Sequence, residues 1–157
     1  MSSTMNPEKL FKENFIKIIT SEDQAIGIYQ AELFWKRRPN DVFDAILVDE
    51  IKHEKNLIDF VHSKGWSFTK RQIMLMHLNR YSGWLIGTFL SILPRRICFY
   101  FHFVAEKQAA SGYNDLIKHI ESSGNPKLID LTDIKNEIKK IKDNETLHSE
   151  IFKALMN

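Results

Sequence analysis

Apolar residues recur along most of the chain at intervals of three and four, which is the spacing of one face of an α-helix. The clearest series lies between about 41 and 63 and consists of Phe43, Ile46, Leu47, Ile51, Leu57, Ile58 and Val61. A short amphipathic segment precedes it over 7–18. A further helix is expected over 20–38, beginning at the hydroxyl and acidic residues of TSED. No alternating pattern of useful length predicts a β-strand.

The segment 81–103 differs from the rest because it is almost free of charge. It reads YSGWLIGTFLSILP, then the pair Arg95-Arg96, then ICFYFHF. Neither apolar run reaches the roughly 20 residues that a membrane-spanning helix needs. Pro94 is placed to begin a new helix. We therefore expect two helices to meet at an apolar, basic hairpin corner over 81–103.

Two more stretches complete an all-α prediction. The helix that begins at the corner is expected to continue to about Ser122, and a last helix is expected over about 131–156. The chain of 157 residues is long enough to form one domain with a substantial core, residues 1–157, in which 1–20 is an N-terminal extension. Six Gly and four Pro leave little room for a turn-rich all-β fold.

Composition excludes several classes of function. The net charge of +2 gives no argument for nucleic-acid binding. A single cysteine, Cys98, excludes an intramolecular disulfide and a cluster of thiolate metal ligands. The N-terminal residues lack the apolar segment of a secretory signal, so we expect the protein in the cytoplasm.

The expected helices carry one pattern of acidic, aromatic and imidazole residues twice. In each copy a Glu is followed seven residues later by a Tyr, and the next long helix carries Glu-x-x-His. Both spacings place the paired side chains on one helix face. The first copy consists of Glu22, Tyr29, Glu50 and His53, and the second of Glu106, Tyr113, Glu145 and His148.

This set of residues matches the ligands of a carboxylate-bridged di-iron or di-manganese bundle. Four carboxylates balance two divalent cations, and two imidazoles complete their coordination. The outer nitrogen of each His should have an acceptor, for which Asp49 and Asp143 are candidates. The alternative is four solvated helices with coincidental acids. Tyr29 and Tyr113 are either core tyrosines with one hydrogen-bonded hydroxyl or redox and proton-relay residues.

The text around these residues resembles a known family. The matching segments are EDQAIGIYQ, ILVDEIKHEKNLIDF, SGWLIG, FVAEKQAASGY and DNETLHSE. They resemble the demethoxyubiquinone hydroxylase family of ubiquinone biosynthesis, which belongs to the ferritin-like di-iron proteins. The resemblance extends from about Glu22 into the last expected helix.

The resemblance implies a ferritin-like four-helix bundle with an internal two-fold repeat and additional short helices. It implies hydroxylation of a quinone ring with O2 and an external two-electron reductant. It also implies peripheral attachment to the inner (cytoplasmic) membrane, which holds the quinone. The implied ligands of two iron ions are Glu22, Glu50, His53, Glu106, Glu145 and His148.

Three positions depart from the family pattern. The stretch before Glu22 reads KIITS where the family has an Arg-Val-Asn-His-Ala-Gly-like sequence. Lys107 follows Glu106 where a second Glu is common, and Gly112 stands where a His often precedes the tyrosine. The ligands survive these changes, so the changes bear on the identity of the quinone rather than on the metal site.

The apolar corner has two interpretations. Residues 84–103 could dock on a membrane, with the Arg95-Arg96 pair at the level of the headgroups. The aromatic residues that would enter the interface are Trp84, Phe89, Phe99, Phe101 and Phe103. Alternatively, the corner is a buried hairpin of the bundle or the interface of a homo-oligomer.

Two other functions remain open. A ferroxidase or a peroxide-scavenging di-iron protein needs the same ligands without an organic substrate, and a metal-free helical interaction module would use the apolar corner to bind a partner. The remaining histidines that we singled out, His77, His102 and His119, are expected to be ordinary core or surface residues. Glu54, one residue beyond His53, is expected to face solvent.

Overall fold

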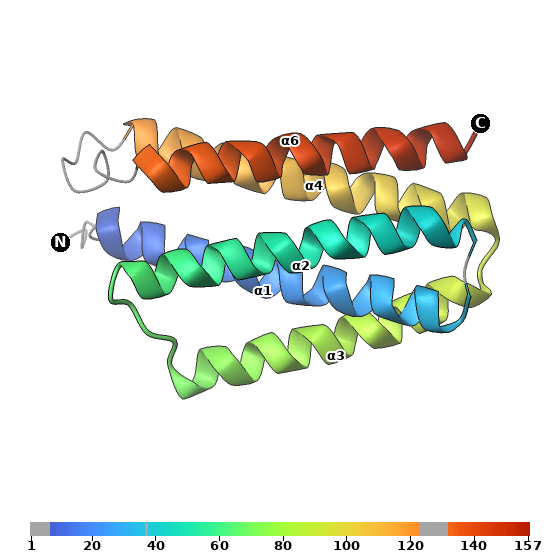
Figure 1. The fold of residues 1–157 in the computed structure, drawn as a ribbon, viewed down its shortest axis with the longest axis horizontal. Coiled ribbons are helices and arrows are strands. Elements are labelled where there is room, and N and C mark those ends of the chain that lie inside the picture. Colours follow the sequence, from blue (N-terminus) through green and yellow to red (C-terminus); the bar gives the residue numbers. More distant parts are fainter. Residues whose placement is uncertain (1–6, 37, 123–131) are drawn as a thin grey trace, which may run out of the picture.

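The computed structural model describes residues 7–36, 38–122 and 132–157, and its regular structure over these residues is entirely α-helical. Four helices form a bundle, and a fifth, α3, packs on the outside of α1 (Figure 1). The helices are α1 (Pro7–Phe34), α2 (Asn40–Ser63), α3 (Lys70–Ile92), α4 (Arg95–Ser122) and α6 (Thr132–Leu155). The all-α prediction is confirmed. The additional helix is not short, because α3 has 23 residues.

The first helix has no break at the TSED sequence, so the predicted helix start at Thr20 is wrong. The hydroxyls of Thr20 and Ser21 donate hydrogen bonds to carbonyl oxygens three residues earlier, over 2.7 and 2.6 Å. A hydroxyl satisfied in this way is compatible with a helix interior. Phe11, Phe15 and Ile19 are fully buried. The described part of the expected N-terminal extension is therefore the first half of α1 and part of the core.

Glycine residues allow α1 and α3 to approach until their backbones touch. A Cβ atom built on Gly83 of α3 would lie 2.0 Å from the carbonyl oxygen of Gln24 in α1. A Cβ on Gly27 of α1 would lie 2.1 Å from the carbonyl oxygen of Arg80 in α3. Any larger residue at either position would separate the helices. The close packing fixes α3 along the α1 side of the bundle (Figure 1).

Two apolar clusters fill the two ends of the bundle. The cluster toward the start of α1 includes Phe11, Phe15, Leu57, Ile138 and Ile141. The cluster toward the start of α4 includes Tyr29, Phe43, Cys98, Phe99 and Phe152. The middle turns of α1, α2, α4 and α6 lie between them and carry buried acidic and imidazole side chains. The core therefore encloses a polar band.

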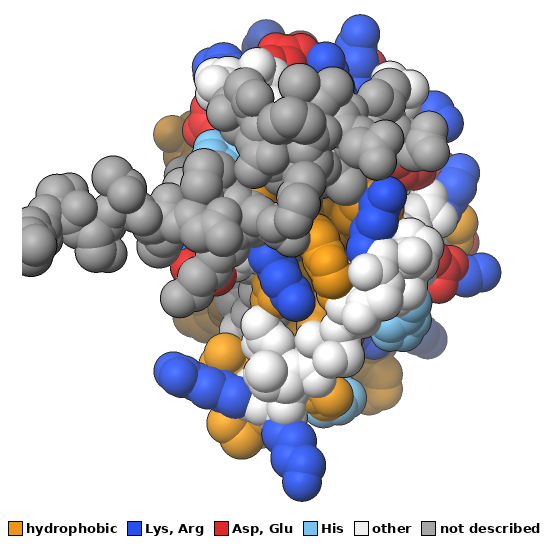
Figure 2. All heavy atoms as spheres, turned by 90° about the vertical axis from the view of Figure 1, so that its left-hand side faces the viewer, with side chains coloured by type: hydrophobic (Ala, Val, Ile, Leu, Met, Phe, Trp, Pro, Cys, Tyr) orange, Lys and Arg blue, Asp and Glu red, His pale blue; other side chains and the backbone are white. Residues whose placement is uncertain are grey.

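Described charged residues of both signs lie at the end of the bundle where α1 begins. Figure 2 shows Lys and Arg side chains spread around this end and interspersed with acidic ones. Among the described helices, none combines the length and the apolar character needed to cross a bilayer.

Candidate metal centre

Six acidic and imidazole side chains from four helices meet in the polar band. α1 and α4 each contribute one Glu, while α2 and α6 each contribute a Glu-x-x-His pair. Each of the six side chains is at most 5% exposed. The structure thus brings together all six predicted ligands: Glu22, Glu50, His53, Glu106, Glu145 and His148.

The six residues form two overlapping groups of four. In each group the candidate ligand atoms all lie within 4.8 Å of one another. One group adds Glu22 and His53 to a shared pair of carboxylates, and the other adds Glu106 and His148 to the same pair. The shared pair consists of Glu50 and Glu145, which are the Glu residues of the two Glu-x-x-His sequences. These two carboxylates are therefore the ones placed to bridge two cations.

In the first group, the Nδ1 atom of His53 faces two carboxylates. It lies 3.1 Å from Oε1 of Glu145 and 3.7 Å from Oε2 of Glu22. These separations suit ligand atoms arranged around one ion, because metal–nitrogen and metal–oxygen bonds are each about 2 Å long.

In the second group, the Nδ1 atom of His148 faces three carboxylates. It lies 3.4 Å from Glu50 Oε1, 3.7 Å from Glu106 Oε2 and 4.0 Å from Glu145 Oε2. The ring centroids of the two histidines are 6.3 Å apart. Both Nδ1 atoms thus point inward, so the two groups have related geometry.

The outer nitrogen of each histidine contacts a residue of the other Glu-x-x-His helix. In both cases this is the residue directly before the Glu. His148 Nε2 lies 3.3 Å from Oδ2 of Asp49, as predicted. His53 Nε2 lies 3.3 Å from the amide of Asn144. The predicted partner Asp143 is exposed and pairs with a lysine instead, because position 143 faces away from the band on α6. Donation from His148 Nε2–H to Asp49 leaves the Nδ1 lone pair of His148 free for a cation, whereas the Asn144 amide nitrogen beside His53 Nε2 is itself a donor.

Several polar atoms of this cluster are buried without a hydrogen bond to any described residue. They are Glu22 Oε2, Glu50 Oε1, His53 Nδ1, Glu145 Oε1 and His148 Nδ1. Buried polar atoms almost always have a partner, so a group of unpaired ones needs an explanation. All five are acceptors or can act as acceptors, and all belong to the two groups of four. The donor set and its charge of four carboxylates fit a pair of divalent cations.

The crowding of buried carboxylates shifts the pKa values of the groups in the cluster. Burial and the neighbouring carboxylates raise the pKa of Glu50 and of Glu145 well above the usual range. Burial also acts to raise the pKa of Glu106, but the nearby His148 and other neighbours outweigh it and hold that pKa at about 2. For His148, burial acts in the opposite sense, and Glu106 with Glu50 raises its pKa to about 10. Without a cation, the cluster therefore retains protons at neutral pH.

Each tyrosine of the repeat contacts the carboxylate of the other copy. The hydroxyl of Tyr29 donates a hydrogen bond to Glu106, and that of Tyr113 donates one to Glu22. Both rings are about 1% exposed. Burial raises the pKa of both phenols well above 10, so they remain donors. The tyrosines are core residues with one hydrogen-bonded hydroxyl, and the acceptor of that bond is a candidate ligand.

The carboxylates open into a cavity of about 710 Å³. It lies between α1 and α4 and is also lined by Ile86 of α3. Its polar wall includes all four Glu of the cluster and Tyr113, and most of the other wall is apolar. Ile97, Tyr100 and Phe101 line it as well and are 36 to 59% exposed. The cavity therefore connects the carboxylates with the surface of the expected hairpin corner.

Comparison with protein families gives a match over residues 20–155, to the family described as ubiquinone biosynthesis protein COQ7. The matched range contains the whole carboxylate and imidazole cluster. The chain belongs to this family. No curated protein and no solved structure gave a match.

Membership of the COQ7 family agrees with the fold and gives the protein its general role. The family has a ferritin-like helical bundle, which is the architecture seen here. The role of the family is that of a hydroxylase in ubiquinone biosynthesis. The resemblance stated from the sequence is confirmed, and the protein is an enzyme of this family.

One residue of the COQ7-like segment around the first Glu-x-x-His is placed differently from the sequence prediction. Glu54 does not face solvent, because its side chain is only 15% exposed and lies 2.7 Å from Nη2 of Arg80. The same Nη2 atom lies 2.9 Å from Asp23. Burial and the nearby Glu54 raise the pKa of Asp23 to about 7, although Arg80 acts to lower it. Sequence spacing within α2 could not show that α3 crosses at this point.

Sequence reasoning also missed a second buried polar cluster, formed by Glu32, Cys98 and His102. His102 Nε2 lies 2.7 Å from one Glu32 oxygen, and Cys98 Sγ lies 2.9 Å from the other. These are hydrogen-bond distances, and the His102 ring stacks on Tyr29 at 5.0 Å. The cluster satisfies its own polar atoms, in contrast to the unpaired atoms of the metal centre. The i, i+4 spacing of Cys98 and His102 was the available signal, but nothing pointed to Glu32.

Proposed function

We propose that the protein is a di-iron, O2-dependent monooxygenase that hydroxylates the ring of a demethoxyubiquinone-type quinone. The observation that carries the proposal is the cluster of unpaired, buried carboxylates and imidazoles at the closed end of an apolar cavity. Membership of the family supports a role in ubiquinone biosynthesis, and the mostly apolar wall of the cavity supports an apolar substrate. The reaction replaces a ring C–H by C–OH, with O2, two electrons and two protons giving the hydroxylated ring and one water.

The residues that would hold the two cations follow from the two groups of four. Glu22 with His53 and Glu106 with His148 would each serve one cation, and Glu50 with Glu145 would serve both. Bound iron would supply the reduction of O2. Manganese uses the same donor types, so the iron assignment rests on the chemistry of the reaction.

The protein's own residues prepare the site in two ways. The Tyr29 and Tyr113 hydroxyls hold the carboxylates of Glu106 and Glu22 in fixed orientations. The apolar walls limit water around the reacting groups, which protects the reaction from unproductive loss of reducing equivalents. Since burial and the neighbouring carboxylates raise the pKa of Glu50 and of Glu145, loading the site with cations should release protons.

The cavity indicates how an apolar substrate would reach the site. Its outer wall contains Ile97, Tyr100 and Phe101, which belong to the segment 84–103. A quinone with an apolar tail is dissolved in the bilayer. An opening on a membrane-facing surface would let the ring enter while the tail remains in lipid. Such an apolar wall also argues against a ferroxidase, for which an acidic path would suit the entry of iron.

We further propose that the hairpin corner docks on the membrane. Large apolar side chains are exposed along α3 and at the start of α4, and they include Tyr81, Leu85, Phe89, Ile92 and Ile97. Exposed fractions of 49 to 78% are unusual for so many apolar residues on one side of a soluble domain. Among the aromatics expected to enter the interface, Phe89 and Phe101 are exposed, whereas Phe99 is buried.

The metal assignment is tested by iron content. Protein produced with ample iron should carry about two irons per chain, while Glu50→Ala and His148→Ala should carry far less. Glu150→Ala, whose side chain is exposed on α6 outside the cluster, is the control. Unchanged iron content in both ligand variants would refute the assignment. An iron-free wild-type protein would favour the interaction module.

The reaction is tested with a demethoxyubiquinone that has a short tail, a two-electron reductant and 18O2. One 18O atom should enter the ring for each turnover. O2 consumption without hydroxylated product would favour the ferroxidase or peroxide-scavenging function. Co-sedimentation with vesicles tests the docking of the corner, and size-exclusion chromatography without lipid tests whether the same surface forms a homo-oligomer.

A further inference from the structure

A second cavity lies at the end of the bundle where α2 and α4 begin, opposite to the end in Figure 2. Its volume is about 660 Å³, and it shares no lining residue with the cavity of the metal centre. Its wall combines basic and apolar side chains. The lining residues are Arg38, Pro39, Asn40, Asp41, Arg95, Arg96, Phe99 and Leu155.

Among the residues that the structure describes, the basic side chains of this cavity have no counter-ion. Within the described part of the chain, none of Arg38, Arg95 and Arg96 forms a hydrogen bond or an ion pair. Asp41 is the one acidic lining residue, and the side chain of Arg96 points away from the cavity, so Arg38, Arg95 and Asp41 leave it with a net charge of +1. Arginines commonly pair with carboxylates or bind phosphate, because their planar fork matches both. The cavity therefore carries an excess of positive charge that an anion would neutralise.

Two features of the α2 start add to this preference for an anion. α2 has 24 residues, and no side chain caps its first turn. Uncapped N–H groups at a helix start carry partial positive charge. The side-chain oxygen of Asn40 is buried without a hydrogen-bond partner among the described residues. Rotation of this amide would present its NH2 group as a further donor.

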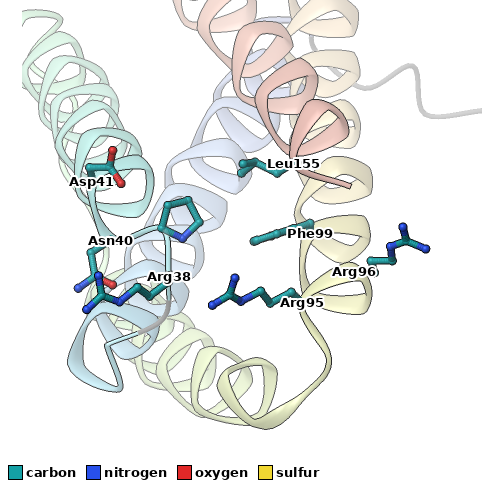
Figure 3. A pocket seen from close by; sticks show the side chains of 8 residues that line it. Arg38, Asn40, Asp41, Arg95, Arg96, Phe99 and Leu155 are labelled. Atoms are coloured by element: carbon teal, nitrogen blue, oxygen red, sulfur yellow. The ribbon is translucent and has the colours of Figure 1, made fainter. Parts of the chain in front are cut away.

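Arg95 and Arg96 are neighbours in sequence, but their side chains point in different directions. In Figure 3, Arg95 extends from α4 toward the side of the cavity where Arg38 lies, below Phe99 in this view. Arg96 extends away from the cavity on the other side of α4 (Figure 3). Both residues are exposed. Arg95 and Arg96 therefore carry the same charge and are both exposed, but only the side chain of Arg95 points into the cavity.

The apolar part of the cavity limits the kind of anion. Pro39, Phe99 and Leu155 offer no hydrogen-bond donors in their side chains, so a small hydrated anion would leave them uncovered. The chain next to Arg95 is apolar on both sides, with Ile92 78% exposed and Ile97 52% exposed. An anionic group attached to an apolar chain satisfies both parts of the cavity.

We propose that this cavity binds the phosphate headgroup of one anionic phospholipid, with Arg95 at the phosphate and Phe99 and Leu155 beside its apolar chain. The site would fix the position of the protein on the membrane, with the mouth of the substrate cavity facing the lipid. The choice of a lipid rests on the docking proposed above. The anion site itself rests on the arginines and the cavity.

The test uses the metal-loaded wild-type protein, Arg95→Gln and the matched control Arg96→Gln. The probes are short-chain phosphatidylglycerol and phosphatidylcholine, both below their micelle concentrations, and inorganic phosphate. Phosphatidylglycerol should raise the melting temperature of the wild type and of Arg96→Gln, and should leave that of Arg95→Gln unchanged. Phosphatidylcholine, whose headgroup has no net charge, should have a much smaller effect.

Vesicles then test the site in its proposed setting. Removing one arginine near an anionic membrane weakens binding by roughly fivefold through general attraction. Arg96→Gln should show about this loss on vesicles of phosphatidylcholine with phosphatidylglycerol, whereas Arg95→Gln should lose at least about twentyfold. Unaltered iron content and helix content in both variants would exclude a folding defect.

Three outcomes would overturn the proposal. If Arg95→Gln and Arg96→Gln behaved equally, the lipid would be bound by general electrostatic attraction to the protein surface and not by a specific site. An equal stabilisation by inorganic phosphate and by phosphatidylglycerol would assign a free-anion site and reject the lipid. A wild type that binds neither vesicles nor phosphatidylglycerol would reject the docking and the lipid site together, while leaving the iron and hydroxylation tests unaffected.

Discussion

Tyr29 of α1 donates its hydroxyl hydrogen bond to Glu106 of α4, and Tyr113 of α4 donates its own to Glu22 of α1. Each copy of the repeated pattern thus holds a carboxylate of the other copy. The relation makes the tyrosines part of the candidate metal centre without requiring them to bind a cation. It also explains why a buried phenol follows each of these Glu residues by seven positions.

Replacing the tyrosines by Phe should weaken metal binding without removing it. In Tyr29→Phe, Glu106 loses a donor that orients it, and an effect of about 10- to 100-fold on metal affinity is expected. Tyr113→Phe should act similarly through Glu22. Competition with a chelator measures the affinity. A variant with unchanged affinity and unchanged turnover would make that hydroxyl a packing feature only.

The contact between Asp49 and His148 should matter more than the one between Asn144 and His53. The Asp49 carboxylate can accept a hydrogen bond from His148 Nε2–H and so strengthen its Nδ1 lone pair, whereas the amide nitrogen of Asn144 beside His53 is a donor and cannot do so. Asp49→Ala should therefore lower metal affinity by about 10- to 100-fold, with a smaller loss in Asn144→Ala. Asp143→Ala is the control, because this residue is exposed outside the cluster. Equal losses in Asp49→Ala and Asp143→Ala would contradict the role of Asp49.

The metal-free protein should become less stable as pH rises. The folded-state pKa values of Glu50 and Glu145 are raised, so their contribution to stability is complete below about 4.5 and is lost as pH rises. The raised pKa of His148, about 10, adds a loss toward that pH. Glu106, with its pKa near 2, contributes fully above about 4.5.

Melting temperatures of the metal-free protein at pH 5.5, 7 and 8.5 measure this slope. Glu145→Gln, which is neutral at every pH, should flatten it. Divalent metal should restore stability most at the highest pH, because fewer protons then compete for the ligands. A metal-free protein whose stability rises between pH 5.5 and 8.5 would contradict the raised pKa values.

Arg80 should stabilise the junction of α1, α2 and α3. Its side chain contacts the carboxylates of Asp23 and Glu54, and Arg80→Ala would leave both acids close together without their shared cation. Because Arg80 is partly exposed, a loss of about 1 to 3 kcal/mol in the free energy of unfolding is expected. Asp23→Asn in the Arg80→Ala background should recover part of it. Urea unfolding checks both, and an additive double variant would show that the acids do not interact.

Gly112 should influence which ring fits the cavity. It lies on the cavity wall within α4, and a Cβ there would meet nothing within 4 Å. Since Gly in a helix interior is less favourable than Ala by about 1 kcal/mol, Gly112→Ala should raise the melting temperature by about 2 to 4 °C. Gly112→Leu should raise the KM for the quinone severalfold. Ser111→Leu, outside the cavity lining, is the control, and equal KM values for Gly112→Leu and Ser111→Leu would contradict a role in specificity.

The pattern of residues predicted the helices and the six-residue cluster because both depend on local spacing. Glu-x-x-His and the Glu–Tyr pairs each lie on one helix face, so their order along the chain was enough to bring them together. The continuity of α1 through Thr20 could not be predicted, since a hydroxyl can cap a new helix or bond to the preceding turn. The environments of Glu54, Glu32 and Asn144 depend on residues of other helices, and periodicity within one helix gives no information about them.

The contacts that cross between the two copies have a consequence for how the enzyme acquires its metal. The paired residues are 77, 91, 91 and 99 positions apart in sequence. Such distant contacts form only after long loops have closed. Neither half of the chain can assemble a complete ion-binding shell alone. Metal uptake would therefore act as a checkpoint on assembly, because only a chain whose halves have docked in register can retain the ions.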